Sequence, residues 1–125
     1  MRDIVNNLGP AAALAPAART ASANGSGIDL RGFGSAMVLF QAGAITDGTH
    51  TPSVEESDDN VTFSAVSGAD LEGTLAAMSA NTVQKVGYRG GKRYIRAVMA
   101  VTGATTGGLT AATVVRGHPA IAPVA

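Results

Sequence analysis

The stretch that decides the fold is Val83 to Val101, which reads Val-Gln-Lys-Val-Gly-Tyr-Arg-Gly-Gly-Lys-Arg-Tyr-Ile-Arg-Ala-Val-Met-Ala-Val. Apolar and polar residues alternate on both sides of a glycine pair, which is the pattern of half-buried strands. Gly90 and Gly91 can supply the positive φ angles that a two-residue type I′ turn requires. The stretch therefore predicts one β-hairpin that turns at Gly90-Gly91.

The predicted hairpin has one apolar face and one cationic face, because residues opposite each other in an antiparallel pair share a face. The apolar face carries Val86, Tyr88, Ile95, Ala97 and Met99, and the other face carries Lys85, Arg89, Lys92, Tyr94 and Arg96. On the second face, like charges oppose each other, Arg89 against Lys92 and Lys85 against Arg96. Each such pair costs about 0.2–1 kcal/mol. A negatively charged partner would remove this cost.

The charges of the chain lie in blocks. Residues 47–72 contain seven acids and no Lys or Arg, and residues 85–116 contain six bases and no acid. The acids are Asp47, Glu55, Glu56, Asp58, Asp59, Asp70 and Glu72. We predict that the acidic cluster of residues 55–59 meets the basic face, within one chain or between copies. The alternative is that both blocks are solvated surface, where ion pairs contribute only about 0–1 kcal/mol.

A basic face with one aromatic residue also has a nucleic-acid interpretation. Tyr94 among Lys and Arg residues resembles the mixture that single-strand binders use. However, the formal net charge of the chain is 0, and a dedicated nucleic-acid binder is expected to be basic. A single aromatic residue is also a poor stacking platform, and Tyr94 opposite Gly87 would serve to cover the glycine backbone. We therefore predict protein carboxylates as the partner.

The predicted core is small for a chain of 125 residues. The hydrophobic fraction is 46%, but the sequence contains no Trp, three Phe and two Tyr. Large apolar side chains bury the most area, at about 25 cal/mol per Å². We expect oligomerisation to supply further burial.

Short β-rich segments with Gly-rich connections predict an all-β fold. The expected architecture is a single antiparallel β-sandwich or small barrel-like domain with at most one short helix. Besides the hairpin, strands are expected at residues 35–42, 51–56, 61–66 and 110–116, and the helix at residues 70–80. Acids near the start of that helix favour it, whereas Gly73 limits it.

The composition changes near residue 27 and again near residue 120. Residues 1–27 are rich in Ala, Pro, Asn, Ser and Gly and predict an extended N-terminal arm, with a short strand possible at residues 19–23. This arm would be either a disordered tail or a segment that orders on a neighbouring subunit. Residues 28–119 form the predicted β domain, and residues 120–125 an extended C-terminal tail.

The sequence offers little catalytic chemistry. Cysteine is absent, which excludes disulfides and thiolate sites and fits a reducing cytosol. His50 and His118 lack the spacing of a zinc site, and the acidic cluster lacks the spacing of a calcium-binding EF-hand. No glycine pattern matches a dinucleotide or phosphate loop. We predict no enzymatic activity, no cofactor and no metal, and no membrane partner because no apolar run approaches ~20 residues.

The hairpin motif resembles a family of small structural proteins of tailed bacteriophages and prophages. The family pattern is approximately Ile/Val-Gly-Tyr-x-Gly-x-Lys-Arg-Tyr-Val/Ile-Arg, which residues 86–96 match, with Gly117-His118-Pro119 downstream. The acidic segment 55–59, residues 69–74 and the start with Asp3, Asn6, Asn7 and Leu8 also match. The chain departs from the family in its longer Ala/Pro-rich N-terminal stretch and its shorter region at residues 55–69.

This resemblance implies a non-enzymatic virion protein. The reading that suits a small neutral β domain is a capsid decoration (cement) protein, which binds the outside of the phage head and bridges capsomers. Its partners would be the major capsid protein and its own copies as a homotrimer, assembled in the host cytoplasm, with no nucleic acid. The expected contact residues are Lys85, Arg89, Lys92, Tyr94, Arg96, Glu55, Glu56, Asp58 and Asp59. The alternatives are a head-tail connector or tail component and, in another class, an oligonucleotide- or glycan-binding β module.

Overall fold

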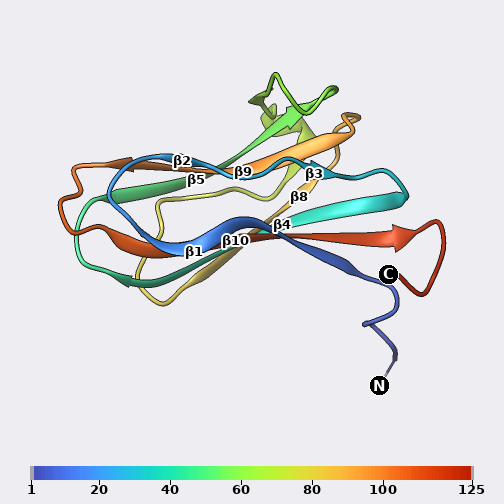
Figure 1. Ribbon diagram of the computed structural model, residues 1–125, viewed down its shortest axis with the longest axis horizontal. Helices are drawn as coiled ribbons and strands as arrows, with labels where there is room; N and C mark the ends of the chain where they lie inside the picture. Colours follow the sequence, from blue (N-terminus) through green and yellow to red (C-terminus); the bar gives the residue numbers. More distant parts are fainter. Residues whose placement is uncertain (1, 125) are drawn as a thin grey trace.

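The computed structural model describes residues 2–124, and these residues form an all-β sandwich (Figure 1). Two antiparallel sheets pack face to face without closing into a barrel, which confirms the predicted fold class and selects the sandwich. Within the described residues the helical structure is limited to one 3₁₀ turn, η1 (Gly68–Asp70). No helix in this part of the chain is long and apolar enough to cross a membrane.

In both sheets the spatial order of the strands differs from their order along the chain. Sheet A has the order β1-β10-β4-β8-β7, and sheet B has the order β2-β9-β5-β6, with β3 also paired to β9. The strands of sheet A are β1 (Gly9–Arg19), β10 (Gly108–Pro119), β4 (Phe33–Ile45), β8 (Val83–Tyr88) and β7 (Leu71–Glu72). Those of sheet B are β2 (Ala23–Asn24), β9 (Tyr94–Thr102), β5 (Thr49–Ser57) and β6 (Ser64–Ala65), with β3 (Ile28–Asp29) beside β9.

The core lies between the two sheets and is formed by alternate residues of the long strands. Sheet A contributes Val38, Phe40, Val86 and Val114, and sheet B contributes Ile95, Ala97 and Met99, all at most 1% exposed. Phe40 is the largest of these side chains. The alternation seen in residues 83–101 therefore identifies the buried faces of β8 and β9 correctly.

The predicted hairpin is wrong, although both of its strands exist. β8 pairs with β4 and β7 in sheet A, whereas β9 pairs with β5, β2 and β3 in sheet B. Residues 89–93, here called the crossing segment, carry the chain from one sheet to the other (Figure 1). Gly90 and Gly91 are not among the positive-φ residues of the described chain, so they do not form a type I′ turn. A Cβ at Gly90 would instead collide with the ring of Tyr88.

The single cationic face that the hairpin implied is therefore absent from the described structure. Lys85 pairs with Leu39 on the outer face of sheet A, and Arg96 pairs with Glu55 on the outer face of sheet B. Gly87 lies beside Glu72 and not beside Tyr94. The alternating pattern specifies which side of a strand is buried, but it does not specify which strand is the neighbour.

The N-terminal segment is part of the sandwich, and the boundary expected at residue 27 is not present. β1 pairs with β10 along nearly its whole length, and Ala13 and Leu14 are only 2% and 6% exposed. The register shifts twice, between Ala12 and Leu14 and between Leu14 and Ala17, which obscures the alternation in the sequence. The prolines of β1 are tolerated because it is an edge strand. The short strand predicted at residues 19–23 is replaced by the end of β1 and the start of β2.

The other predicted strands are found with one exception. Residues 35–42, 51–56 and 110–116 lie in β4, β5 and β10, whereas only Ser64–Ala65 of residues 61–66 form a strand. The helix predicted at residues 70–80 is wrong, since β7 follows η1 directly and Gly73 then adopts a positive φ of 104°. The extended backbone of β7 and the positive φ of Gly73 are both incompatible with an α-helix at this point.

Residues 73–82 run along the side of the sandwich between β8 and β5. The Gln84 side chain binds Ala76 twice, accepting from its backbone N and donating to its backbone O, both at 2.9 Å. The backbone N of Met78 donates to the backbone O of His50 at 2.7 Å, and the Met78 side chain is 7% exposed. This segment therefore closes the gap between the two sheets.

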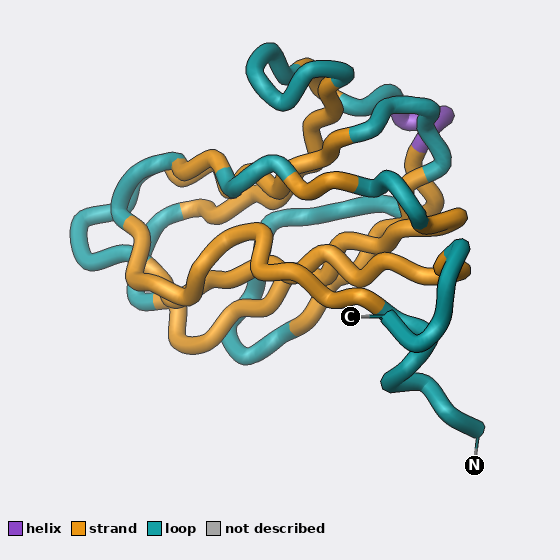
Figure 2. Tube along the Cα trace, turned by 45° about the vertical axis from the view of Figure 1, so that its right-hand side comes forward, coloured by secondary structure: helices purple, strands orange, loops and turns teal. Residues whose placement is uncertain are grey.

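The two ends of the described chain meet at one corner of the sandwich (Figures 1 and 2). The backbone N of Val124 donates to the backbone O of Asn6 at 3.0 Å, and that of Ala120 donates to Gly32 at 2.8 Å. The predicted tail is thus bent back onto the domain as far as residue 124; residue 125 lies outside the described residues.

Candidate functional site

Some of the predicted contact residues lie at the end of the sandwich where the crossing segment joins the two sheets. Tyr88, the last residue of β8, points inward and is 8% exposed. Its hydroxyl donates to Glu56 Oε1 on β5 at 2.7 Å and accepts the backbone N–H of Lys92 at 3.0 Å. One side chain thus links sheet A, sheet B and the crossing segment.

The Tyr88 hydroxyl is held as a hydrogen-bond donor. Burial raises the pKa of Tyr88 to about 12, and the hydrogen bond to Glu56 acts in the same direction. A phenol with such a pKa keeps its proton at physiological pH. The hydroxyl thus holds Glu56 and the backbone of Lys92 together at this end of the molecule.

Glu55 and Arg96 form the best-covered ion pair of the predicted set. They are direct neighbours on β5 and β9, and Arg96 Nη2 lies 2.6 Å from Glu55 Oε1. Their side chains are only 25% and 22% exposed. The guanidinium also stacks on the ring of Phe63, 4.2 Å from its centroid. Arg96 is therefore covered on one face by an aromatic ring and neutralised at its edge.

Lys92 and Asp58 form a more exposed ion pair. Lys92 Nζ lies 2.7 Å from Asp58 Oδ2, and the two side chains are 43% and 72% exposed. The hydrogen bond to Asp58 raises the pKa of Lys92 above its usual value. Pairs this exposed contribute little to the stability of a fold.

Asp59 organises the turn that precedes β6. Its Oδ1 accepts the backbone N–H groups of Val61 and Thr62 at 2.9 and 3.0 Å and the hydroxyl of Ser57 at 2.8 Å. Hydrogen bonds from Thr62, Val61 and Ser57 lower the pKa of Asp59 to about 2. Oδ1 of this carboxylate is thus committed to its own loop.

A further ion pair at this end was missed by the sequence analysis. Arg93 binds Asp29 in a bidentate manner, with Nε at 3.0 Å from Oδ1 and Nη2 at 2.8 Å from Oδ2. The hydrogen bond from Arg93 lowers the pKa of Asp29 to about 2. Asp29 lies outside the acidic block, but it is the one acid between Asp3 and Asp47. The position of Asp29 apart from the other acids is the feature of the sequence that could have drawn attention to this ion pair.

The remaining predicted residues are dispersed. Tyr94 faces outward from sheet B with Arg93 stacked on its ring at 5.0 Å. Arg89 is exposed, and its backbone N donates to the backbone O of Asp70 at 2.7 Å. Lys85 lies on the far side of the sandwich. The acidic and basic blocks therefore meet within one chain at Glu55–Arg96 and Asp58–Lys92.

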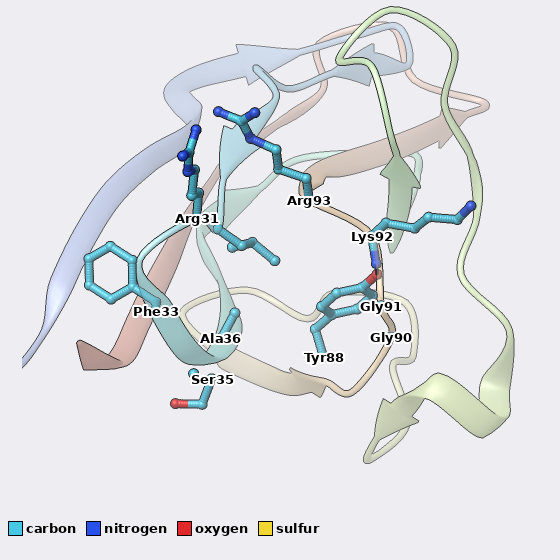
Figure 3. A pocket seen from close by; sticks show the side chains of 11 residues that line it. Arg31, Phe33, Ser35, Ala36, Tyr88, Gly90, Gly91, Lys92 and Arg93 are labelled. Carbon is cyan, nitrogen blue, oxygen red and sulfur yellow. Dashed lines mark hydrogen bonds between the residues drawn. The ribbon is translucent and has the colours of Figure 1, made fainter. Parts of the chain in front are cut away.

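A pocket of about 320 Å³ opens beside the crossing segment (Figure 3). Its walls include Arg31, Phe33, Ala36, Tyr88 and Arg93. Figure 3 shows the Lys92 side chain extending away from this pocket. The lining contains no His and no carboxylate, so the pocket offers a cationic and aromatic surface without an acid–base pair.

The two histidines lie in different environments. His50 is fully buried, with Nε2 at 3.0 Å from the backbone O of Asp47. His118 is exposed, and its Nδ1 lies 2.8 Å from Ser35 Oγ. Among residues 2–124, no three His, Cys, Asp or Glu side chains come together to hold a metal ion.

The outer face of sheet A is a second surface, and the sequence analysis did not identify it. Its central strands present Val115, Met37, Leu39 and Thr113, which pair across β10 and β4. On the same face, Leu109 of β10 and Val83 of β8 are 48% and 56% exposed. A shallow hollow of about 640 Å³ lies on this face, lined in part by Met37, Val115 and Leu8. The face is wide and apolar.

No protein-family model and no curated protein matches this sequence. Among solved structures, the chain is similar to the crystal structure of SPBc2 prophage-derived protein YomS, with a TM-score of 0.57. The two chains are 16% identical, and the match covers 93% of this chain and 98% of that chain. The likeness therefore concerns the fold, and it extends over nearly the full length of both chains.

Proposed function

We propose that this chain is a non-enzymatic structural protein of a phage virion, and specifically a capsid decoration (cement) protein. The observation that carries the proposal is the full-length fold likeness to a prophage-derived protein. The resemblance of residues 86–96 to small phage structural proteins supports it from the sequence. The two lines agree on a phage origin, and the decoration role is the finer part of the proposal.

The distribution of chemistry over the surface supports a protein partner. Two of the four cations that suggested a nucleic-acid site, Lys92 and Arg96, each bind an acid of the same chain. Direct phosphate binding would require these pairs to open. By contrast, the outer face of sheet A is apolar and open, as expected for contact with protein.

The proposed partners are the major capsid protein and further copies of the chain. A decoration protein bridges several shell subunits at once, so that many weak contacts combine into stable attachment. The proposed location is the outer surface of the head, reached after assembly in the host cytoplasm. The pocket beside the crossing segment, with its exposed Arg31, offers acidic shell residues a charged contact.

Cryo-electron microscopy of virions that carry this gene tests the proposal. We expect density for the sandwich at many symmetry-related positions on the outside of the head. Particles from a gene deletion should still assemble but should break at a lower temperature, and added purified protein should restore their stability. Density confined to a unique vertex or to the tail would overturn the decoration role and favour a connector or tail component.

A further inference from the structure

We propose that the outer face of sheet A binds the same face of a second copy of this chain, in a two-fold pair. The inference deepens the self-association included in the proposed function and rests on it to that extent. It depends on the arrangement of charge and apolar side chains in two neighbouring rows of this face.

The Met37 row and the Leu39 row run across the centre of the face. The Met37 row consists of Pro10, Val115, Met37, Gly87 and Glu72, which are successive cross-strand partners from β1 to β7. The Leu39 row consists of Ala12, Thr113, Leu39 and Lys85 on β1, β10, β4 and β8. The rows are two residues apart along each strand, which corresponds to about 6.8 Å.

Each row carries one charged residue, and both charges lie at the same end of the strand order. Glu72 lies over Gly87, where a Cβ would meet the Glu72 Cβ at 3.3 Å and Oε2 at 3.6 Å. Lys85 is exposed one strand away on β8. Neither side chain takes part in an ion pair within residues 2–124. One unpaired cation and one unpaired anion therefore border an otherwise uncharged part of the face.

A two-fold axis satisfies both charges at once. We place this axis in the plane of the interface, midway between the two rows and perpendicular to the strands. Rotation about it sets the Met37 row of one copy against the Leu39 row of the other. Lys85 then lies opposite Gly87 of the second copy, with Glu72 of that copy one strand away, and the same arrangement forms again by symmetry. Met37 and Val115 pack against Leu39 and Thr113 of the second copy, as the inner faces of a sandwich do.

The same geometry argues against other occupants of this face. A partner with a single sign of charge leaves either Lys85 or Glu72 unpaired at the interface, which costs free energy. In a ring of three joined edge to edge through sheet A, the edge that carries both charges would face the β1 edge of the next copy. That edge carries Ala and Pro residues on its exposed side. The two-fold pair thus differs from the trimer expected from the sequence.

Sedimentation equilibrium of the purified full-length chain tests the inference. We expect a concentration-dependent dimer, and a mass that remains that of a monomer or a trimer overturns the two-fold pair. Leu39→Glu places a charge in the centre of the apolar rows and should weaken the dimer by about a hundredfold or more. Thr51→Glu, at an exposed outward position of sheet B, is the matched control and should leave the dissociation constant unchanged.

Charge reversal identifies the register of the pair. Lys85→Glu alone should weaken the dimer by about tenfold, whereas Lys85→Glu combined with Glu72→Lys should restore the wild-type dissociation constant. A double variant as weak as the single one overturns the proposed contact. Thermal unfolding of each variant separates loss of association from loss of folding. Because purified protein is used, a monomeric result leaves the location of the chain on the virion to be decided by microscopy.

Discussion

The two outer faces of the sandwich come from strands with the same alternating pattern, yet they treat charge in opposite ways. On the outer face of sheet B, Arg96 is paired with Glu55 and stacked on Phe63. On the outer face of sheet A, Lys85 and Glu72 have no ion-pair partner within residues 2–124. The comparison teaches that a block of charge in a sequence can be consumed inside the fold, while isolated charges on an apolar face remain available for a partner.

Arg96→Ala should have the largest effect on stability, with Lys85→Ala as its matched control on the other face. Loss of Arg96 leaves Glu55 only partly solvated and uncovers Phe63, so we expect a loss of about 2–3 kcal/mol in the free energy of unfolding. Lys85→Ala should change it by less than about 0.5 kcal/mol. Urea unfolding at low protein concentration measures both. Equal effects for the two variants would remove the distinction between the faces.

Tyr88→Phe should have a smaller effect and tests whether the two sheets are joined at the crossing segment. The variant keeps the buried ring but leaves Glu56 without its donor and the Lys92 N–H without its acceptor. We expect a loss of about 1–2 kcal/mol. In the variant, backbone amides of residues 89–93 should exchange faster than in the wild type, whereas those of β4 should exchange at the same rate. Unchanged hydrogen exchange at residues 89–93 would show that the hydroxyl does not hold the crossing segment.

Acidification should produce the smallest effect and should act on the sheet B side. The pKa of Asp59 is lowered from 3.8 to about 2 in the folded chain. A lowered pKa means that the ionised carboxylate stabilises the fold at pH values above the ordinary pKa. This contribution is lost as the pH falls from about 4 to about 2.

Asp59→Asn retains an oxygen that can accept the same backbone hydrogen bonds but does not titrate. We therefore expect the variant to lose less stability than the wild type over that pH interval, as measured by thermal unfolding. If both proteins show the same dependence on pH, the carboxylate does not contribute through its charge.

The limits of the sequence analysis are clearest in Val83 to Val101. Alternation identified both strands and their inward residues, because burial on one side of a strand imposes a period of two. The predicted pairing is wrong because Gly90 and Gly91 do not form a type I′ turn. Gly90 serves a different need, the close approach of the backbone to the Tyr88 ring. The pairing of β8 with β4 and of β9 with β5 joins segments that are distant in the sequence, and a local pattern does not encode it.

The N-terminal strand shows a second limit. β1 contributes Ala13 and Leu14 to the core, but two register shifts and two prolines remove the periodic signal.

The ion pairs could also be predicted only in part. The meeting of the acidic and basic blocks could be predicted from their opposite charges. The choice of Glu55 for Arg96 depends on the register of β5 against β9, which only the fold supplies.

The two hydrogen bonds between Gln84 and Ala76 also help to explain how the chain avoids uncontrolled polymerisation. A bare strand border is a template on which identical chains can stack into fibrils. Here the amide of Gln84 holds residues 73–82 against β8, and Pro10 and Pro16 interrupt the row of donors on β1 at the opposite border. Growth by adding strands is therefore obstructed along β8 and along β1. A protein concentrated in many copies can then remain a discrete unit.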